Sequence, residues 1–430
     1  MSQLPAPLSE LAWRELLFQH TDGLGDAFRS GTVSAYCGFD PTADSLHIGS
    51  LVPIMGLVHL QRAGHRPIAL VGGGTGMIGD PSGRSSERSL LDLRTIEANA
   101  EGIRLQLSRF LDFDRVGGAK LMNNAEWLGK LPLMDFLRDT GKHFSVNYML
   151  AKDSVSARMD DGISFTEFSY MLLQAHDFLE LYKREGVTLQ IGGSDQWGNI
   201  TAGLKLIGSS AGATAHAMTM PLVTNANGSK FGKSEGGAIW LDAARTSPYK
   251  FYQYWIGADD RDISRWVRYF TLMPLEEITA LDMSVREHPE RREAQRALAA
   301  DVTARVHGAD SARVAAEVSA LLFGKGDATA LSEAALSALR DEIPFTTHRE
   351  TPETGNALDV LNWVTELGLA ASRGAAKRLL AQGGLSVNGV KLSESGSPVS
   401  REQLLRGKYA LIKKGAREYG LVEVPNSTAE

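Results

Sequence analysis

The order of apolar and polar segments between residues 33 and 240 predicts strands that alternate with helices. Three apolar runs have the length of buried strands: 33–38, 66–71 and 188–191. A stretch with helical periodicity over 48–63 follows the first of them. Such alternation predicts an α/β fold, with a parallel sheet covered by helices on both faces. Ligands of such sheets bind at the carboxyl ends of the strands.

Two regions depart from this alternation. Residues from about 115 to 165 interrupt it and are expected to form an inserted, mostly helical segment. Residues 247–325 have helical patterns, with Ser247-Pro248 as a favourable helix start and a second amphipathic helix over 291–306. They predict an all-α domain.

The end of the chain has the pattern of a separate small module. Residues 341–357 are polar, contain two prolines and are expected to be a linker. Beyond them, Ser372 is placed to cap a helix that ends before Gly383-Gly384. Asn388-Gly389 stands between two triplets of alternating apolar and polar residues, 385–387 and 390–392, and predicts a hairpin. Two further strands are expected at 409–412 and 419–424.

Composition limits the classes of protein that fit. The chain is 43% hydrophobic and 22% charged, which is ordinary for a globular protein, and no apolar run approaches a membrane span. We expect no secretory signal at the N-terminus. The single cysteine, Cys37, excludes an internal disulfide and fits a reducing compartment.

The net charge of −6 hides an asymmetry. Residues 359–421 contain ten Lys and Arg against five Asp and Glu. A basic module on an acidic body predicts that the end of the chain contacts phosphate.

The first chemical signature runs from Tyr36 to Ser50, where a strand gives way to a helix. It contains His47-Ile48-Gly49-Ser50 at the helix start, where free N–H groups and the helix dipole favour phosphate. Thr42 and His47 could donate hydrogen bonds to a polyphosphate, and Gly49 would let a flat ring approach the backbone. The alternative is that His47 only caps the helix.

The second signature is Lys230-Phe231-Gly232-Lys233-Ser234. Two lysines three residues apart in a glycine-bearing loop could stabilise charge that grows on phosphorus. The alternative is a solvated surface loop. Residues 227–234 nearly match the P-loop pattern but begin with Asn227, where glycine is required.

A third segment, Gly74-Thr75-Gly76-Met77-Ile78-Gly79, matches the dinucleotide pattern. Asp80-Pro81 follows directly, so the helix that would carry a pyrophosphate cannot simply continue. We interpret this segment as a glycine-lined floor. Asp80 could pair with an ammonium group, and Arg84 and Arg88 could face phosphates.

A polar stripe completes the candidate site. Tyr170, Gln174 and Asp177 share one helix face, beside apolar Leu172 and Leu173. They predict either a network of buried polar groups or a pocket for a small polar ligand such as an amino acid. Gly193, Asp195 and Gln196 follow the strand over 188–191 at the ligand-binding edge. The spacing of histidines and Cys37 predicts no metal site.

Together these segments resemble the bacterial-type tyrosyl-tRNA synthetases, a class I aminoacyl-tRNA synthetase family. The resemblance covers nearly the whole chain and rests on six segments: 36–51, 73–88, 162–174, 189–203, 230–234 and 247–255. One position departs from the family pattern, because Ser50 stands where histidine is frequent. We expect its shorter side chain to weaken a contact with the nucleotide without abolishing activity.

The resemblance implies a domain organisation. A Rossmann-like catalytic domain would span 1–240 with the insertion at about 115–165, followed by an all-α domain near the anticodon over 247–325. After the linker, 358–424 would form a small α+β RNA-binding domain like one in a ribosomal protein. The insertion would lie at a homodimer interface.

The resemblance also implies roles for the candidate residues. The substrate tyrosine would be held by Tyr36, Thr75, Asp80, Tyr170, Gln174, Asp177 and Gln196. ATP would be held by Cys37, Gly38, Asp40, Gly49, Ser50, Gly193, Asp195 and Lys233. The pyrophosphate that leaves would be stabilised by Thr42, His47, Arg84, Arg88, Lys230, Lys233 and Ser234. RNA would be bound by Arg373, Lys377, Arg378, Lys413 and Lys414.

The expected function is therefore that of a tyrosine–tRNA ligase in the cytoplasm, with tyrosine, ATP carrying Mg²⁺, and tRNA as partners and without a protein metal cage. Two alternatives remain at this stage. One is a tryptophanyl-tRNA synthetase-like enzyme, against which the Tyr36 and Asp177 pair argues. The other is an RNA-binding relative without catalysis, against which the intact His47, Lys230 and Lys233 argue.

Overall fold

The computed structural model describes residues 4–82, 91–156, 159, 162–234, 237–323, 326–348, 358–392 and 399–425. The chain forms two compact units. Met1–Ser247 with Tyr254–Leu298 is the first, and Pro248–Gln253 with Ala299–Glu430 is the second. The helical region expected over 247–325 contributes residues to both units.

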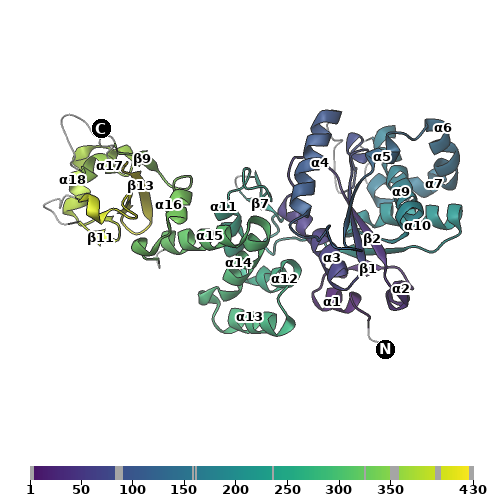
Figure 1. Cartoon of the computed structure of the whole chain (residues 1–430), viewed down its shortest axis with the longest axis horizontal. Coiled ribbons are helices and arrows are strands. Elements are labelled where there is room, and N and C mark those ends of the chain that lie inside the picture. The colour runs from purple at the N-terminus through teal and green to yellow at the C-terminus, as the bar shows by residue number, and fades with distance from the viewer. Residues whose placement is uncertain are drawn as a thin grey trace. The chain divides into compact units, whose positions relative to one another are not determined.

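The first unit is built around a six-stranded sheet with the order β1-β6-β5-β2-β3-β4. Its strands are β1 (Gln19–His20), β2 (Ser34–Phe39), β3 (Arg66–Val71), β4 (Lys120–Asn123), β5 (Val187–Gly193) and β6 (His216–Met220). All neighbouring pairs are parallel except β1 with β6. Figure 1 shows α3 (Leu51–Arg62) and α4 (Leu93–Leu107) on one side of the sheet, and α9 (Phe165–Glu185) and α10 (Trp197–Ala211) on the other.

The sheet reverses its direction of growth between β2 and β5. The chain passes from β2 to β3 and β4 toward one edge, and from β5 to β6 toward the other. Crevices form beyond the carboxyl ends of the strands at such a reversal. This topology confirms the predicted α/β sheet, and β2, β3 and β5 confirm the three predicted strands.

The prediction of a helical insertion over 115–165 is wrong at its beginning. Residues 120–123 form β4, which pairs in parallel with β3 through Ile68–Val71. The strand has only four residues and lies at the sheet edge, so its pattern is too short to separate from a loop. The rest of the segment contains the short helices α5 (Ala125–Leu128), α6 (Leu133–Asp135), α7 (Val146–Leu150) and α8 (Asp153–Ser156).

Helices follow the sheet as predicted. They are α11 (Pro248–Ile256), α12 (Asp260–Phe270), α13 (Leu275–Glu287), α14 (Glu293–His307) and α15 (Ala309–Leu322). The buried Arg14, just after α1 (Leu8–Trp13), donates to the carbonyls of Arg268, Thr271 and Met273 at 2.7–3.1 Å. It thereby satisfies carbonyl groups between α12 and α13 and ties them to the N-terminal segment.

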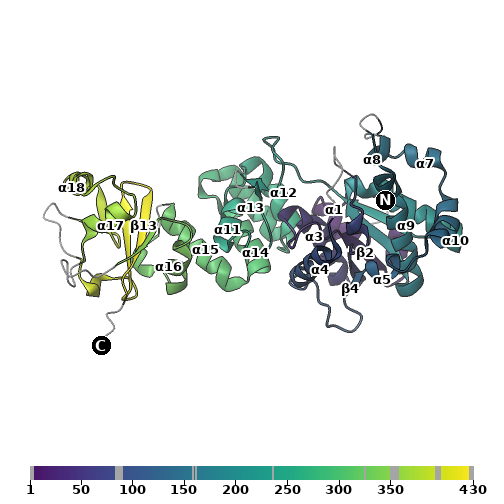
Figure 2. The same ribbon diagram turned by 90° about the horizontal axis from the view of Figure 1, so that it is seen from above.

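The second unit contains a five-stranded sheet with the order β11-β10-β12-β13-β9. The strands are β9 (Phe345–Thr347), β10 (Leu385–Val387), β11 (Val390–Lys391), β12 (Tyr409–Lys414) and β13 (Glu418–Glu423). Alternate residues of β12 face opposite ways: Tyr409 and Leu411 pack with α15 and α16 (Glu333–Leu339), and Ala410 and Ile412 pack with α17 (Val360–Glu366) and α18 (Arg373–Ala381). Both faces of the sheet are therefore covered by helices, which Figure 2 shows around β13.

The local predictions for this unit are confirmed. The side chain of Ser372 caps α18 by accepting from the amide of Ala375. Asn388 and Gly389 have φ values of 53° and 85° in the turn between β10 and β11. Positive φ at both central residues is what a type I′ hairpin turn requires.

The predicted linker over 341–357 is wrong in part. Phe345–Thr347 form β9, which pairs in parallel with Leu421–Glu423 of β13. The strand has three residues, and its partner lies more than 70 positions away, so no local pattern reveals it. Residues 349–357 of the expected linker lie outside the described residues.

Helices α9 and α10 pack closely at Gly203. A Cβ at this position would lie 2.7 Å from Cδ1 of the fully buried Phe178. We expect Gly203→Ala to lower the free energy of unfolding by about 1–3 kcal/mol, because the ring cannot move in a packed core. Urea unfolding followed by tryptophan fluorescence measures this change.

Gly208 on the same helix is the matched control. It is exposed, and a Cβ there would meet only the carbonyl oxygen of Ala213, at 3.9 Å. Gly208→Ala should raise stability by about 0.5–1 kcal/mol, because alanine is the better helix former. Equal effects of the two substitutions would contradict close packing at Gly203.

Candidate active site

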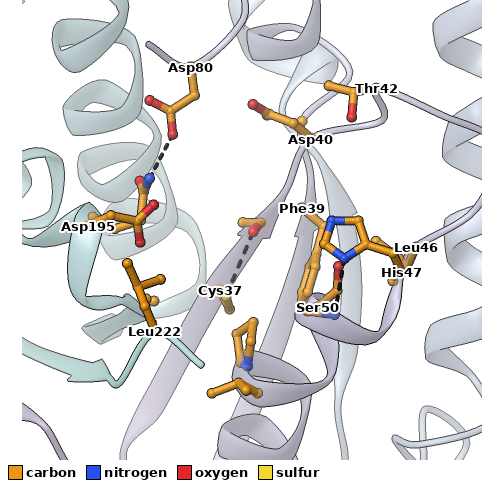
Figure 3. A pocket seen from close by; sticks show the side chains of 18 of the residues that line it. Cys37, Phe39, Asp40, Thr42, Leu46, His47, Ser50, Asp80, Asp195 and Leu222 are labelled. Carbon is orange, nitrogen blue, oxygen red and sulfur yellow. Dashed lines mark hydrogen bonds between the residues drawn. The ribbon is translucent and has the colours of Figure 1, made fainter. Parts of the chain in front are cut away.

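A cavity of about 1080 Å³ opens beyond the carboxyl ends of β2 and β5. Most of the residues predicted for the site line it: Tyr36, Cys37, Gly38, Asp40, Thr42, His47, Gly49, Ser50, Thr75, Asp80, Tyr170, Gln174, Asp177, Gly193, Asp195, Gln196 and Lys230. In Figure 3, Asp80 and Asp195 lie on one side of the pocket, and Thr42, His47 and Ser50 lie on the other. Lys233, on β7 (Lys233–Ser234), is not among the lining residues.

Arg84 and Arg88 lie outside the described residues. In the glycine-rich segment Thr75–Met77 make a single 3-10 turn, and residues 78–82, the last described before a gap, do not continue it as a helix. Gly72 and Gly73 lie against Asp40 and Asn123, where a Cβ would come within 2.3 Å of a side-chain oxygen.

The deep end of the cavity holds two buried polar groups, Tyr36 on β2 and Asp177 on α9. Their exposed fractions are 1% and 2%. Asp177 Oδ1 accepts from Trp127 Nε1 at 2.6 Å, and Oδ2 accepts from Asn124 Nδ2 at 2.8 Å. The hydroxyl of Tyr36 has no hydrogen-bond partner among the described residues. A buried hydroxyl without a partner is costly and indicates a place for a polar ligand atom.

Burial governs the ionisation of both groups. It raises the pKa of Asp177 to about 7, against the opposing effect of the hydrogen bonds from Asn124 and Trp127. Burial and the nearby Asp177 raise the pKa of the Tyr36 hydroxyl well above its ordinary value. The Tyr36 hydroxyl is therefore neutral near pH 7, whereas Asp177 titrates there.

Asn124 and Trp127 were not predicted from the sequence. Asn124 also accepts from the amide of Gly74 at 2.7 Å and donates to Thr75 Oγ1 at 2.9 Å, so it joins the glycine floor to Asp177. Asn124 follows β4 directly, and Trp127 lies on α5, the short helix that comes next. Recognition of that strand would have placed them at the ligand-binding edge of the sheet.

Carboxylates and amides surround the middle of the cavity. Tyr170 Oη and Thr75 Oγ1 each donate to Asp40 at 3.0 Å. Gln196 Nε2 donates to Asp80 Oδ2 at 2.7 Å, and Gln174 Nε2 donates to Gln196 Oε1 at 3.4 Å. Burial and the nearby Asp80 raise the pKa of Asp195. Three carboxylates, those of Asp40, Asp80 and Asp195, therefore line this cavity and favour a cationic ligand group.

The first signature forms the opposite wall. His47 Nδ1 accepts from the amide of Gly49 at 3.0 Å, so the histidine does cap the turn η1 (Ile48–Ser50). Burial lowers the pKa of His47, and the neutral ring then carries its proton on Nε2. A Cβ at Gly49 would lie 2.7 Å from His47 Cε1, so the glycine permits this placement of the ring.

Cys37 presents a neutral thiol to the cavity. Burial raises its pKa to about 12, and its Sγ lies 3.7 Å from the carbonyl oxygen of Gly38. Ser50 precedes α3, and its side chain makes no capping hydrogen bond to that helix.

Residues 239–240 form a short strap that joins the two signatures. Ile48 N donates to the carbonyl of Ile239 at 3.0 Å, and Ile239 N donates to the carbonyl of Gly232 at 2.9 Å. His47 also forms a β-bridge with Trp240. Segments nearly 200 residues apart are thereby held on one side of the cavity, with Lys230 at its lining and Lys233 exposed.

The predicted RNA-binding residues belong to the second unit. Lys377 and Arg378 are exposed on α18, and Arg373 pairs with Asp359 at 2.6 Å. Lys414 pairs with Glu418 at 2.9 Å, and Lys413 Nζ lies 5.0 Å from the centre of the Tyr419 ring.

Two kinds of feature are absent from the described residues. No group of three or more His, Cys, Asp or Glu is arranged to hold a metal ion. No helix in the part of the chain that the structure describes has the length and apolarity needed to cross a membrane.

Comparison with known proteins decides the family. Residues 29–324 match the model of the class I tRNA synthetases for tryptophan and tyrosine, and residues 336–422 match that of the tyrosine–tRNA ligase C-terminal domain. The chain belongs to the tyrosine–tRNA ligases of class I. It is thus an aminoacyl-tRNA synthetase that joins tyrosine to tRNA with ATP as a substrate.

Individual relatives agree along nearly the full length. The tyrosine–tRNA ligase of Anaeromyxobacter dehalogenans strain 2CP-1 is 52% identical over 97% of this chain and 99% of its own. That of Geobacillus stearothermophilus is 50% identical over 96% of this chain and 99% of its own. A truncated mitochondrial tyrosyl-tRNA synthetase from Aspergillus nidulans is 31% identical, with a TM-score of 0.67 over 74% of this chain and 94% of its own.

Proposed function

We propose that the deep end of the cavity holds the side chain of tyrosine between Tyr36 and Asp177. The observation that carries this proposal is the buried Tyr36 hydroxyl, which has no partner among the described residues and lines the cavity with Asp177. The phenolic hydroxyl of the substrate would donate to the Asp177 carboxylate and accept from Tyr36. Phenylalanine has no hydroxyl, so it would leave the buried Tyr36 hydroxyl without a partner and Asp177 with only its bonds from Asn124 and Trp127, which costs free energy.

The polar middle of the cavity would hold the rest of the amino acid. Asp80, Tyr170 and Gln174 would bind its ammonium group with Thr75 nearby, and Gln196 would lie near its carboxylate. The carboxylates of Asp40, Asp80 and Asp195 support this placement, because their negative charge attracts an ammonium ion.

ATP would occupy the space between β2, β5 and the first signature. Cys37, Gly38, Gly193 and Asp195 would contact its ribose, and Asp40, Gly49 and Ser50 would place the nucleotide. Its phosphates would meet Thr42, the Nε2–H of neutral His47, and the loop residues Lys230, Lys233 and Ser234, with Arg84 and Arg88 nearby. Mg²⁺ would arrive on the ATP phosphates as part of the substrate.

The chemistry requires little from the protein beyond placement and charge. The tyrosine carboxylate is ionised at pH 7 and can attack the α-phosphorus of ATP without a general base. Tyrosyl-adenylate forms and pyrophosphate leaves, while the lysines stabilise the charge that grows on the phosphates. A ribose hydroxyl at the 3′ end of the tRNA then attacks the activated carbonyl and releases AMP.

The tRNA and a second copy of the chain would bind through residues that do not line the cavity. The basic residues of the small domain over 358–424, Arg373, Lys377, Arg378, Lys413 and Lys414, would bind the tRNA, with the helices of 247–325 near the anticodon. Exposed apolar side chains on the segment after β4, including Leu133, Met134 and Phe165 at 68%, 73% and 77% exposure, support a homodimer through this segment. We place the enzyme in the cytoplasm, where tRNA is charged for translation.

The role of Lys233 can be tested by Lys233→Ala. We expect the rate of tyrosyl-adenylate formation to fall by a factor that corresponds to about 3–4 kcal/mol, by analogy with a lost oxyanion donor. The affinity for tyrosine should stay unchanged, because Lys233 does not line the amino-acid pocket. Single-turnover activation kinetics measure both quantities.

Lys183→Ala is the matched control, because Lys183 is 54% exposed on α9 and pairs with Glu180. It should leave the activation rate as in the wild type. A loss of tyrosine affinity in Lys233→Ala as large as its loss of rate would contradict the proposed role.

The role of Asp177 predicts a pH dependence. Burial raises its pKa to about 7, so nearly every Asp177 is ionised above pH 8. The ionised form, which would accept the phenolic hydrogen bond, is lost as the pH falls through 7. Tyrosine should bind about tenfold more weakly at pH 6 than at pH 8, since about a tenth of the groups are ionised one unit below the pKa. Equilibrium dialysis without ATP measures this affinity.

Asp177→Asn cannot titrate, so its tyrosine affinity should be weak and constant between pH 6 and 8. The same slope in this variant as in the wild type would assign the dependence to another group.

A further inference from the structure

The signature loop is anchored to two helices outside the cavity. Phe231, between the two lysines, lies in a box of four aromatic rings from α11 and α12. Its centroid is 5.1 Å from Trp266, 5.5 Å from Phe270, 6.0 Å from Tyr254 and 6.1 Å from Trp255. The rings of Phe231 and Phe270 are stacked, at 3° between their planes. All of these residues belong to the first unit.

One hydrogen bond joins the same helix to the backbone of the loop. The amide of Gly232 donates to the hydroxyl oxygen of Tyr254 at 3.0 Å. Burial raises the pKa of Tyr254 to about 12, so the hydroxyl stays neutral across the working range of pH. The Tyr254 ring is nearly parallel to that of Trp266, at 6° and 6.1 Å, so its hydroxyl is held in a fixed place.

Gly232 is the point where the loop meets the first signature. It has a φ of 80°, and a Cβ there would lie 3.1 Å from Cγ1 of Ile48. Its carbonyl accepts from Ile239, whose own carbonyl accepts from Ile48. The amide that Tyr254 holds is therefore one residue from Lys233 and two hydrogen bonds from the His47 segment.

The other end of the loop is also attached to α12. The amide of Ala226 donates to Asp262 Oδ2 at 2.8 Å, and Arg265 donates to the carbonyl of Thr224 at 2.9 Å. Arg265 and Asp262 form an ion pair with each other. The lysine that lines the cavity, Lys230, thus lies between two attachments to the same pair of helices.

We propose that the Tyr254 hydroxyl is a positioning group for tyrosine activation, which acts through the Gly232 amide to place Lys233 at the phosphates. It touches neither substrate, because Tyr254 is not among the residues that line the cavity. The proposal rests on the proposed role of Lys233. Residues that support the reaction would then include one on α11, a helix that belongs neither to the sheet nor to either signature.

Tyr254→Phe removes the hydroxyl and keeps the ring in the aromatic box. We expect a fall of about tenfold in the rate of tyrosyl-adenylate formation, which corresponds to one hydrogen bond of about 1.4 kcal/mol. The KM for tyrosine should not change. Tyr269→Phe is the matched control, since Tyr269 lies on α12 and no hydrogen bond between it and the loop occurs among the described residues.

A double-mutant cycle with Lys233→Ala separates positioning from a general effect on the fold. If Tyr254 acts through the loop, Tyr254→Phe should slow a Lys233→Ala enzyme less than twofold. A tenfold loss in both backgrounds, a wild-type rate for Tyr254→Phe, or a raised KM for tyrosine would each overturn the proposal. Should Tyr254→Phe fold poorly, Phe231→Leu tests the same attachment from the loop side with the same expected coupling.

The double-mutant cycle also separates the role of Tyr254 from the role of Lys233 on which it rests. A Lys233→Ala enzyme with wild-type activation would remove the role of Lys233 and this proposal with it. A slow Lys233→Ala enzyme beside an unaffected Tyr254→Phe enzyme would overturn only the role of Tyr254.

Discussion

A carboxylate buried among aromatic side chains is stable only when its oxygens are hydrogen-bonded, and Asp177 meets this condition through Asn124 and Trp127. Much of the site depends on that arrangement. Asn124 fixes Asp177 and at the same time holds the Gly74 amide and the Thr75 hydroxyl of the cavity floor. The neighbouring Tyr36 hydroxyl has no such partner among the described residues, which is the basis for proposing that it binds a polar atom of the substrate.

The sheet topology brings these groups together. Tyr36 is on β2, Gly193 ends β5, and Asn124 follows β4, so three carboxyl ends of parallel strands meet at one edge. The helix α9 adds Tyr170, Gln174 and Asp177 along a single face. The lysine loop is a different element, which the strap at 239–240 ties to the first signature and which Phe231 ties to α11 and α12. The proposed selection of the amino acid and the proposed stabilisation of the phosphates would therefore be supported by separate contacts.

Features that are local or periodic could be predicted from the sequence. The junction from Tyr36 to Ser50 combines a strand, a turn and a helix start, and the polar stripe on α9 repeats at helical spacing, so both were visible. Asn124 and Trp127 were missed because β4 is too short for its pattern to be recognised in the sequence. Strand β9 was missed because its partner β13 lies far along the chain. Tyr254 was missed for another reason. An aromatic residue in an apolar helix is expected to be part of the core, and only the tertiary structure shows that its hydroxyl accepts from the Gly232 amide. Such contacts depend on tertiary placement, which no window of residues contains.

We propose that Tyr36 and Asp177 together select tyrosine for the reaction with ATP. ATP–pyrophosphate exchange with the purified protein, with each standard amino acid supplied separately, measures this selection. We expect exchange with tyrosine and none above background with phenylalanine or tryptophan. Exchange with phenylalanine at a comparable rate would show that these two buried groups do not select the substrate.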